Sequence, residues 1–352
     1  MSLSDTPPAA SSAPRRTLSL TLTVVLLVAV AAVAVGATAG YYALHPSSTA
    51  PGPGDVTVVD DLGRTVTAPA NAGKVVVLAP SVMDMVFRLG LRSSVVAVGC
   101  TASIPGGILN EYSPNQTAAW GLTNATCVTD YPTLNTEGIA NASAQLVLAS
   151  TITSQSAVET LTGTYHIPVV ILAPSTLEGI VGDVRILGQL FPSASASARS
   201  LESELSRTLA SVTSEDANLT NAQVAVPSVL LSYYFDSGGY YTFGPGTFGA
   251  SMIDLAGGSN IAGSVPLQYD EINATVVLND QPTTILYGTS WNDPDLVAGE
   301  TPGVWATAPY WSQLNGAKIP LDVTEVSEPD PTMILALPWV QHDLFPSIVP
   351  AP

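Results

Sequence analysis

The clearest pattern in the chain is a short apolar run followed by a helical repeat. Residues 75–78 are all apolar and mostly β-branched, which is too short for a helix and predicts a buried strand. After Pro80 and Ser81, apolar residues recur at helical spacing over residues 82–89, and Gly90 ends the pattern. A strand that turns through Ser81 into a helix places that turn at the carboxyl edge of a sheet, where open α/β folds bind ligands.

The same alternation continues as far as residue 175. Two β-prone segments, 56–59 and 65–67, flank the turn sequence DDLGR and predict a hairpin. Helical patterns at 82–89 and 156–162 separate some of the apolar runs that predict strands, which lie at 75–78, 95–98, 146–149 and 169–172. Strands alternating with helices indicate a mostly parallel sheet with right-handed crossovers.

A break follows Pro174 and introduces a second α/β region. Two helices are expected at 176–190 and from Ser193 to about Ser214, the second with a leucine stripe. Beyond it, helices are expected at 247–255 and 332–344, and strands at 229–232, 284–287 and 319–323. The pattern predicts an α/β fold of two lobes with mostly parallel sheets joined by a long helix. The first lobe covers 56–175, the connecting helices 176–217 and the second lobe 218–352.

The N-terminal segment 17–44 carries a long uncharged apolar run. At ~1.5 Å per residue the run can cross the ~30 Å hydrocarbon layer of a membrane. Arg15 and Arg16 precede it and no Lys or Arg follows before Arg64. The positive-inside rule therefore makes residues 1–16 a cytoplasmic tail and places the rest of the chain outside.

A cleaved signal peptide is the competing interpretation, because residues 37–39 (ATA) form a small-x-small cleavage pattern. We favour an uncleaved transmembrane anchor, since the apolar run exceeds the ~7–15-residue core of a signal peptide. Residues 45–55 are rich in Pro, Ser, Thr and Gly and predict a stalk.

Composition limits the classes of function. The chain has 352 residues, 11% of them charged, and a formal net charge of −18. Without a basic patch to neutralise phosphates, it is not expected to bind nucleic acid. His45, His166 and His342 are dispersed and show no metal-ligand spacing, so no metal site is predicted. No cofactor is expected, and no nucleophile, zinc or P-loop motif of an enzyme is present in the sequence.

Two features agree with an extracellular location. The only cysteines, Cys100 and Cys127, are expected to form a disulfide in an oxidising compartment, two buried thiols being the alternative. Five glycosylation sequons point to a glycoprotein, and they lie at Asn115, Asn124, Asn141, Asn218 and Asn273.

Four blocks, in order, resemble the substrate-binding proteins of iron-siderophore and cobalamin ABC importers. The first runs from DDLGR at Asp60 through the strand and Pro-Ser turn to Cys100, and the second is YPTLNTEGIANASAQLVLAS (131–150). The others are FGASMIDLAGGSNIAG (248–263) and YWSQLNGAKIPLDV (310–323). The resemblance implies a periplasmic binding protein with a cleft between two lobes, bridged by a rigid helix. Such a protein delivers a ligand to an ABC permease driven by its ATPase and has no catalysis of its own.

The resemblance also implies roles for individual residues. Pro80, Ser81 and Val82 are expected on the floor of the cleft with Thr151 nearby; a capping role for Ser81 at the following helix fits equally well. Docking to the permease uses one acidic residue per lobe. Glu137 matches in the first lobe, whereas Thr275 stands at the acidic position of the second, with Asp270 and Glu271 just upstream.

An aromatic cluster is expected to overhang the cleft. Its flat apolar faces suit a bulky metal-chelate ligand such as a siderophore, a corrinoid or a haem-like molecule, although alternate members are expected to point into the core. The cluster comprises Tyr233, Tyr234, Phe235, Tyr240 and Tyr241, with Tyr269, Trp291 and Trp305 as additions. The expected protein is a membrane-anchored extracellular solute-binding protein, and an archaeal cell surface fits an anchor without a lipid-bearing Cys. The alternative is a glycosylated structural or adhesion protein of the cell surface with the same fold.

Overall fold

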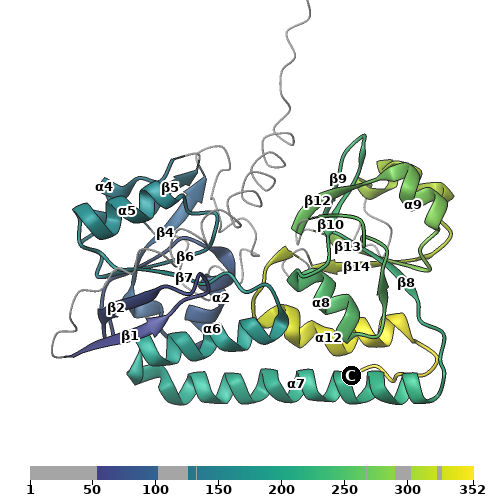
Figure 1. Ribbon diagram of the computed structural model, residues 1–352, viewed down its shortest axis with the longest axis horizontal. Helices are drawn as coiled ribbons and strands as arrows, with labels where there is room; N and C mark the ends of the chain where they lie inside the picture. Colours follow the sequence, from purple (N-terminus) through teal and green to yellow (C-terminus); the bar gives the residue numbers. More distant parts are fainter. Residues whose placement is uncertain (1–53, 102–125, 132, 267, 290–302, 323–326) are drawn as a thin grey trace, which may run out of the picture.

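The computed structural model describes residues 54–101, 126–131, 133–266, 268–289, 303–322 and 327–352. The described residues form two α/β lobes that stand side by side on a common layer of helices (Figure 1). The predicted N-terminal tail, anchor or signal segment and stalk lie outside the described residues, apart from the last residues before the first strand. Within the described part, no helix is both long enough and apolar enough to span a bilayer.

The first lobe is built on one parallel sheet of five strands in the order β5-β4-β3-β6-β7. Its three central strands are completely or largely buried, because helices cover both faces and the residues are aliphatic. The strands are β3 (Val75–Val77), β4 (Val95–Thr101), β5 (Cys127–Tyr131), β6 (Leu146–Ala149) and β7 (Val169–Ile171). The four predicted strands are confirmed, and β5 is an additional strand.

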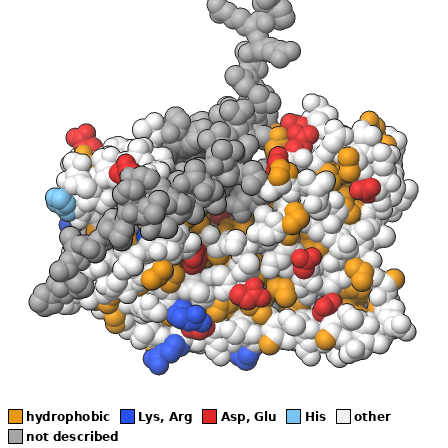
Figure 2. Space-filling model, viewed as in Figure 1, with side chains coloured by type: hydrophobic (Ala, Val, Ile, Leu, Met, Phe, Trp, Pro, Cys, Tyr) orange, Lys and Arg blue, Asp and Glu red, His pale blue; other side chains and the backbone are white. Residues whose placement is uncertain are grey.

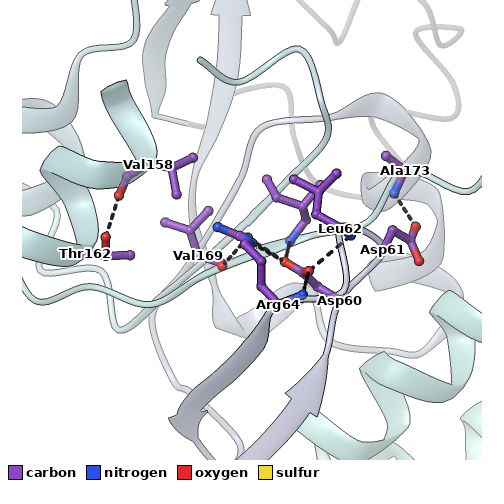
Figure 3. Close-up of polar contacts among 9 residues, drawn as sticks. Asp60, Asp61, Leu62, Arg64, Val158, Thr162, Val169 and Ala173 are labelled. Atoms are coloured by element: carbon purple, nitrogen blue, oxygen red, sulfur yellow. Dashed lines mark hydrogen bonds and ion pairs between the residues drawn. The ribbon is translucent and has the colours of Figure 1, made fainter. Parts of the chain in front are cut away.

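The predicted hairpin is confirmed as β1 (Asp55–Val59) and β2 (Thr65–Pro69), paired antiparallel. Its turn is fixed to the edge strand β7, as Figure 3 shows. Asp60 forms a buried ion pair with Arg64, and its carboxylate also accepts a hydrogen bond from the Ile171 N–H at 3.2 Å. Arg64 Nη2 donates to the Val169 carbonyl at 3.0 Å. The hairpin is therefore part of the first lobe's sheet edge.

The second lobe combines two sheets. A parallel sheet has the order β11-β8-β13-β14, and a small antiparallel sheet has the order β12-β10-β9. The parallel strands are β8 (Ser228–Ser232), β11 (Ser259–Asn260), β13 (Thr284–Thr289) and β14 (Ala317–Asp322). The antiparallel strands are β9 (Tyr234–Phe235), β10 (Gly239–Phe243) and β12 (Gln268–Asn273). The expectation of mostly parallel sheets is thus confirmed for the main sheets, and the antiparallel one was not anticipated.

The lobe helices predicted at 82–89, 156–162 and 247–255 are confirmed with shifted ends, and two further helices, α4 and α9, are additional. In the first lobe they are α2 (Pro80–Arg88), α4 (Thr136–Asn141) and α5 (Gln155–Glu159), which continues as a π-helical turn, Thr160–Thr164. In the second lobe they are α8 (Phe248–Leu255) and α9 (Ala274–Asp280). Short 3-10 turns occur at Arg92–Ser94, Pro192–Ala194, Trp305–Thr307 and Trp311–Gln313.

Three helices form the layer that joins the lobes. α6 (Leu177–Leu190) packs on α7 (Ser195–Asn221), and α12 (Pro331–Leu344) returns from the second lobe onto both (Figure 1). The 27 residues of α7 make a rod about 40 Å long at ~1.5 Å per residue. Its buried stripe is Ala198, Leu201, Leu205, Leu209, Val212 and Leu219. One hydrophobic core runs through this layer from β3 to β8, so the two lobes share packed side chains.

Candidate binding surface between the lobes

The candidate site lies where the main parallel strands of both lobes end. Strand β3 leads to Pro80 and Ser81, β6 leads to Thr151, and β8 leads to Tyr233. Carboxyl ends of parallel strands are the usual place for ligands in open α/β sheets, because the connecting loops and helix N-termini gather there. We call the β3–α2 turn, residues 79–82, together with segment 327–330 the interlobe floor.

A hydrogen bond across the lobes defines this floor. The backbone N–H of Ser81 donates to Glu328 Oε2 at 3.2 Å, joining residues 247 positions apart in the chain. Ser81 is nearly buried, and Pro80 and Val82 beside it are buried as well. The turn predicted from the sequence thus contacts the second lobe directly.

The capping role considered for Ser81 is wrong. Helix α2 begins two residues earlier than expected, with Ala79 as N-cap and Pro80 in the first turn, and no side chain caps it. Proline is favoured at this first position, because it lacks the N–H that a helix start leaves unsatisfied and its φ is already helical. Ser81 therefore presents the first free N–H of the helix, and Glu328 accepts from it.

A buried charged group lies directly behind the floor. Asp84, with 2% of its side chain exposed, pairs with Arg88 at 2.5 Å. Arg88 Nη2 also donates to Thr332 Oγ1 of the second lobe at 3.1 Å. Asp330 caps α12 by accepting from the Thr332 N–H at 2.7 Å, and its other oxygen is buried with no hydrogen-bond partner among the described residues. At the junction, Arg88 thus pairs with Asp84, and its charge also acts on the buried carboxyl group of Asp330.

Burial and mutual repulsion set the protonation of this group. Burial raises the pKa of Asp330 well above its ordinary value, and the charge of Asp84 adds to the rise. Burial also raises the pKa of Asp84, against the opposing attraction of Arg88. The junction between the lobes therefore favours a protonated Asp330 beside an ion pair of Asp84 and Arg88.

The aromatic residues expected on the wall divide into two sets. Tyr240 is fully buried, and its hydroxyl donates to the Pro309 carbonyl at 2.5 Å. Trp305 is 3% exposed and donates from Nε1 to the Gly288 carbonyl at 2.9 Å. These two side chains pack the core of the second lobe, so neither offers a face to a ligand.

The remaining aromatic residues lie nearer the surface. Tyr233, Tyr234 and Phe235 are partly exposed, and Tyr241 is 7% exposed. The Tyr234 and Tyr241 rings are 5.5 Å apart, and Phe235 rests on Trp305 at 5.0 Å. Burial raises the pKa of the Tyr241 hydroxyl, and the charge of Asp236 raises it further. Tyr233, Tyr234 and Phe235 stay candidates for ligand contact. Tyr269 lies on β12, and Trp291 lies outside the described residues.

Positive charge is kept away from the carboxyl ends of the strands. Lys74 and Arg92 precede β3 and β4, and Lys318 is the second residue of β14, so all three stand at amino ends. The other cations beyond residue 55 are Arg64 in the hairpin turn, Arg88 at the end of α2, and Arg185, Arg199 and Arg207 on α6 and α7. Figure 2 shows most of the blue side chains of this face along its lower edge, where α7 runs, and red ones above them.

The two docking positions occupy equivalent places in the lobes. In α4, Asn135 caps the helix by accepting from the Gly138 N–H, and Glu137 is the exposed second residue. In α9, Asn273 caps the helix by accepting from the Thr275 N–H at 2.8 Å, and Thr275 is likewise exposed and second. The sequence match between Glu137 and Thr275 thus corresponds to the same position in two similar helix starts.

Asp270 and Glu271 lie on β12, next to the tip of the small antiparallel sheet. Glu271 and Asp236 both approach Gly238 at the turn between β9 and β10. Burial raises the pKa of Glu271, with the charges of Asp236 and Asp270 adding to it. These acids form a negative surface beside α9, where Thr275 itself carries no charge.

The predicted modifications involve both described and undescribed residues. Cys100 and Cys127 lie on neighbouring parallel strands, with Val98 rather than Cys100 opposite Cys127, and the disulfide between them stays a prediction. The sequon residues Asn141, Asn218 and Asn273 are exposed, whereas Asn115 and Asn124 lie outside the described residues. Sequence reasoning missed Glu328, Asp330 and Asp84. A signal in the sequence could have found them. Asp84 lies four residues before Arg88 in one predicted helix, and Glu328 and Asp330 directly precede another.

Comparison with known families places the chain among binding proteins. Residues 75–318 match the family described as periplasmic binding protein. A cobalamin-binding protein of Halobacterium salinarum is 26% identical over 245 residues, which cover 69% of this chain and 61% of that protein. The chain thus matches less than two thirds of the relative's length.

Solved structures share the fold at low sequence identity. An Fe3+-hydroxamate transport system protein from Saccharomonospora viridis has a TM-score of 0.62 and 19% identity, covering 82% of this chain and 98% of its own. The molybdate periplasmic binding protein of Haemophilus influenzae has a TM-score of 0.65 and 18% identity, covering 82% and 91%. The vitamin B12 binding protein of Vibrio cholerae has a TM-score of 0.58 and 18% identity, covering 79% and 98%.

Proposed function

The chain belongs to the periplasmic binding protein family, and we propose that it is the extracellular solute-binding protein of an ABC importer. It is a binding protein and not an enzyme. Its proposed ligand is a bulky, neutral or cationic organic molecule or metal chelate, of corrinoid, haem-like or hydroxamate-siderophore type. The ligand is proposed to sit above the interlobe floor, between Ser81 and Thr151 on one side and Tyr233, Tyr234 and Phe235 on the other.

The segregation of charge along the sheets is the observation that carries this proposal. The carboxyl ends of the strands lead to Asp236, Asp322 and Glu328, while Lys74, Arg92 and Lys318 stand at amino ends. Burying an anion without a positive partner costs several kcal/mol, more than a few hydroxyl contacts return. Aromatic surface instead favours broad apolar groups, at ~25 cal/mol per Å² removed from water. A neutral or cationic chelate with a large apolar surface fits both conditions.

The names of the relatives support this class of ligand. A cobalamin-binding protein is similar in sequence, and an Fe3+-hydroxamate transport protein and a vitamin B12 binding protein share the fold. A molybdate binding protein shares it too, so the fold alone does not decide the charge of the ligand. The proposed charge of the ligand therefore rests on the side chains of this protein.

Delivery to a permease is proposed to use the exposed starts of α4 and α9. Glu137 supplies a charge for a basic residue of the permease, and the acids beside α9 compensate for Thr275. We further propose that residues 17–44 anchor the protein in the membrane and that residues 45–55 hold the lobes away from it. The ATPase of the importer lies on the cytoplasmic side.

A glycosylated structural or adhesion protein of the cell surface is the second candidate. One observation favours it: the uncharged Thr275 occupies the docking position, and the exposed sequon residue Asn273 caps the same helix. A glycan there would cover the surface that a permease must reach. Uptake of a bound ligand by cells carrying the gene distinguishes the two candidates, because an adhesion protein supports none.

Calorimetry of the full-length chain against a panel of probes tests the ligand class. The panel contains cyanocobalamin, a cationic ferric hydroxamate and a tri-anionic ferric catecholate. We expect binding of one of the first two, with little dependence on salt because few ion pairs form. Tight, strongly salt-sensitive binding of the catecholate alone would contradict the proposal.

A further inference from the structure

The hydrogen bond between Glu328 and Ser81 places a carboxylate where an anion would otherwise bind. Helix α2 has no N–H at Pro80, so the Ser81 N–H is its first available donor. Glu328 Oε2 accepts from it at 3.2 Å. The N-terminal end of a helix carries a positive partial charge and unpaired donors, which makes it a ready place for a phosphate, sulfate or similar oxyanion. In this chain a side chain of the opposite lobe takes that place.

The buried group behind this contact offers an anion no available positive charge. Asp84, one turn further along α2, and Asp330, two residues after Glu328, are both buried. Arg88 is the cation next to them, and Asp84 and Thr332 engage it. An oxyanion at the start of α2 would therefore meet Glu328 directly, with Arg88 turned to other partners.

The contact also lies on the path of the proposed ligand. Ser81 follows β3 of the first lobe, and Glu328 follows β14 of the second, so both stand at carboxyl ends of the main sheets. Residues in such positions form the floor of a site between two α/β units. A charge fixed there acts on whatever the two lobes enclose.

We infer that Glu328 is a specificity-determining residue that excludes oxyanions from the floor of the binding site. The inference rests on the proposed function, because it assumes that the ligand sits above this floor. Glu328 acts in two ways. Its carboxylate occupies the donor at the start of α2, and its charge repels an anion that approaches from solvent. A neutral or cationic chelate meets neither obstacle.

The test compares full-length wild type with Glu328→Ala, Glu328→Gln and Glu178→Gln, using molybdate and sulfate as probes. Glu178 lies in the first turn of α6 and is exposed, so its substitution removes one charge near another helix start. We expect no measurable oxyanion binding by wild type or Glu178→Gln. Glu328→Ala should bind measurably, at least about tenfold more tightly than the detection limit that wild type does not reach. Glu328→Gln should fall between, since it loses the charge and keeps an acceptor. Circular dichroism establishes that each variant is folded.

The position of the new site is checked separately. In Glu328→Ala, the amide resonance of Ser81 should move on adding molybdate, and it should not move in wild type. Oxyanion binding by wild type as tight as by Glu328→Ala would overturn the inference. So would the absence of any gain in both Glu328 variants over Glu178→Gln.

Cyanocobalamin and the ferric hydroxamate serve as parallel probes for the proposed function itself. We expect every variant to keep the wild-type preference between these two. Failure of all variants and wild type to bind either would overturn the proposed ligand class. It would leave the oxyanion comparison at Glu328 intact as a separate result.

Discussion

The two lobes share an α/β architecture and differ in the residue types that form their cores. Besides the core shared through the helical layer, each lobe has a core of its own. In the first lobe this separate core packs against the parallel sheet and consists of buried Val, Ile, Leu and Ala residues. The corresponding core of the second lobe contains Tyr240, Tyr287, Trp305 and Trp311. The rings of Tyr287, Trp305 and Trp311 contact one another, and Trp305 also contacts Phe235. The second lobe also adds an antiparallel sheet, which contributes Phe235 and Tyr240 to this core, while Tyr287 comes from β13 and the two Trp residues come from 3-10 turns.

This difference suggests that the two lobes contribute different properties to the binding site. Aliphatic strands covered on both faces give a close-packed first lobe whose turns are fixed, such as the one at Ser81. Large rings with polar ends give the second lobe a broad surface whose hydroxyl and indole groups need defined partners. We therefore expect substitutions in the two lobes to fail in different ways.

The largest effect is expected at Tyr240. Tyr240→Ala removes a fully buried ring and a hydroxyl bonded to Pro309, and should lower the free energy of unfolding by about 3–5 kcal/mol. Tyr234→Ala, at a partly exposed position two residues beyond β8, should cost under about 1 kcal/mol and weaken ligand binding instead. Urea unfolding and calorimetry separate the two outcomes. Equal losses of stability would show that the aromatic set is not divided into core and wall.

A buried ion pair of the first lobe comes next. Asp60→Ala leaves Arg64 buried without its carboxylate and releases Ile171 at the sheet edge, so we expect a loss of about 3 kcal/mol. The matched control is Glu202→Ala, which breaks the more exposed pair with Arg185 between α6 and α7. That change should alter stability by under about 1 kcal/mol. If the two variants unfold at the same urea concentration, the hairpin contributes no more than a surface pair.

The docking positions give a smaller effect, seen only in transport. Glu137→Arg should reduce uptake at least about tenfold, equal to ~1.4 kcal/mol, because it reverses one charge of a pair with the permease. Thr275→Arg should reduce uptake less, since no charge is reversed there. Affinity for the ligand, measured on purified protein, should not change in either variant. Loss of ligand binding in Glu137→Arg would place this residue in the site or in the fold.

The smallest effect concerns pH and arises where α6 of the joining layer meets the hairpin turn of the first lobe. Burial raises the pKa of Asp183 well above its ordinary value, with the charge of Asp61 adding to the rise. The folded protein then holds this proton while the unfolded chain releases it above about pH 4. Stability is therefore lost as pH rises from about 4 towards the folded pKa.

Asp183→Asn should remove that dependence and make the protein more stable than wild type at neutral pH, while an exposed control, Asp280→Asn, changes nothing. Urea midpoints measured from pH 4 to pH 8 test this expectation. A wild type that gains stability relative to Asp183→Asn as pH rises would contradict it.

The sequence predicted those parts of the fold that have a local cause. The apolar runs of β3, β6 and β7 and the helical repeats of α2, α6 and α8 stand in the sequence itself. The end of α7 was placed near Ser214, yet the helix continues to Asn221. Leu219, seven residues after Val212, keeps the buried stripe although polar residues surround it.

The antiparallel sheet could not be predicted in the same way. All five residues of β10 are buried, so the strand shows no alternation. Its partner β12 is largely polar and is held in the sheet by pairing with β10, for example between Tyr241 and Glu271, which are 30 positions apart in the chain. Only one side of the interlobe floor was predicted: the strand-to-helix pattern placed the Ser81 turn at the edge of the sheet. Glu328 becomes part of the floor only through a contact between residues far apart in the chain.

The hydrogen bonds between the hairpin turn and β7 also affect the tendency of copies of this protein to aggregate. The edge of a sheet offers unpaired backbone groups to any passing strand, which is a common beginning of aggregation. At β7 the carbonyls of Val169 and Ile171 accept from Arg64 and Asp61, and the N–H of Ile171 donates to Asp60. A second chain finds these groups already engaged. Colloidal stability at high local concentration, as on a crowded cell envelope, thus depends in part on five residues that have no contact with a ligand.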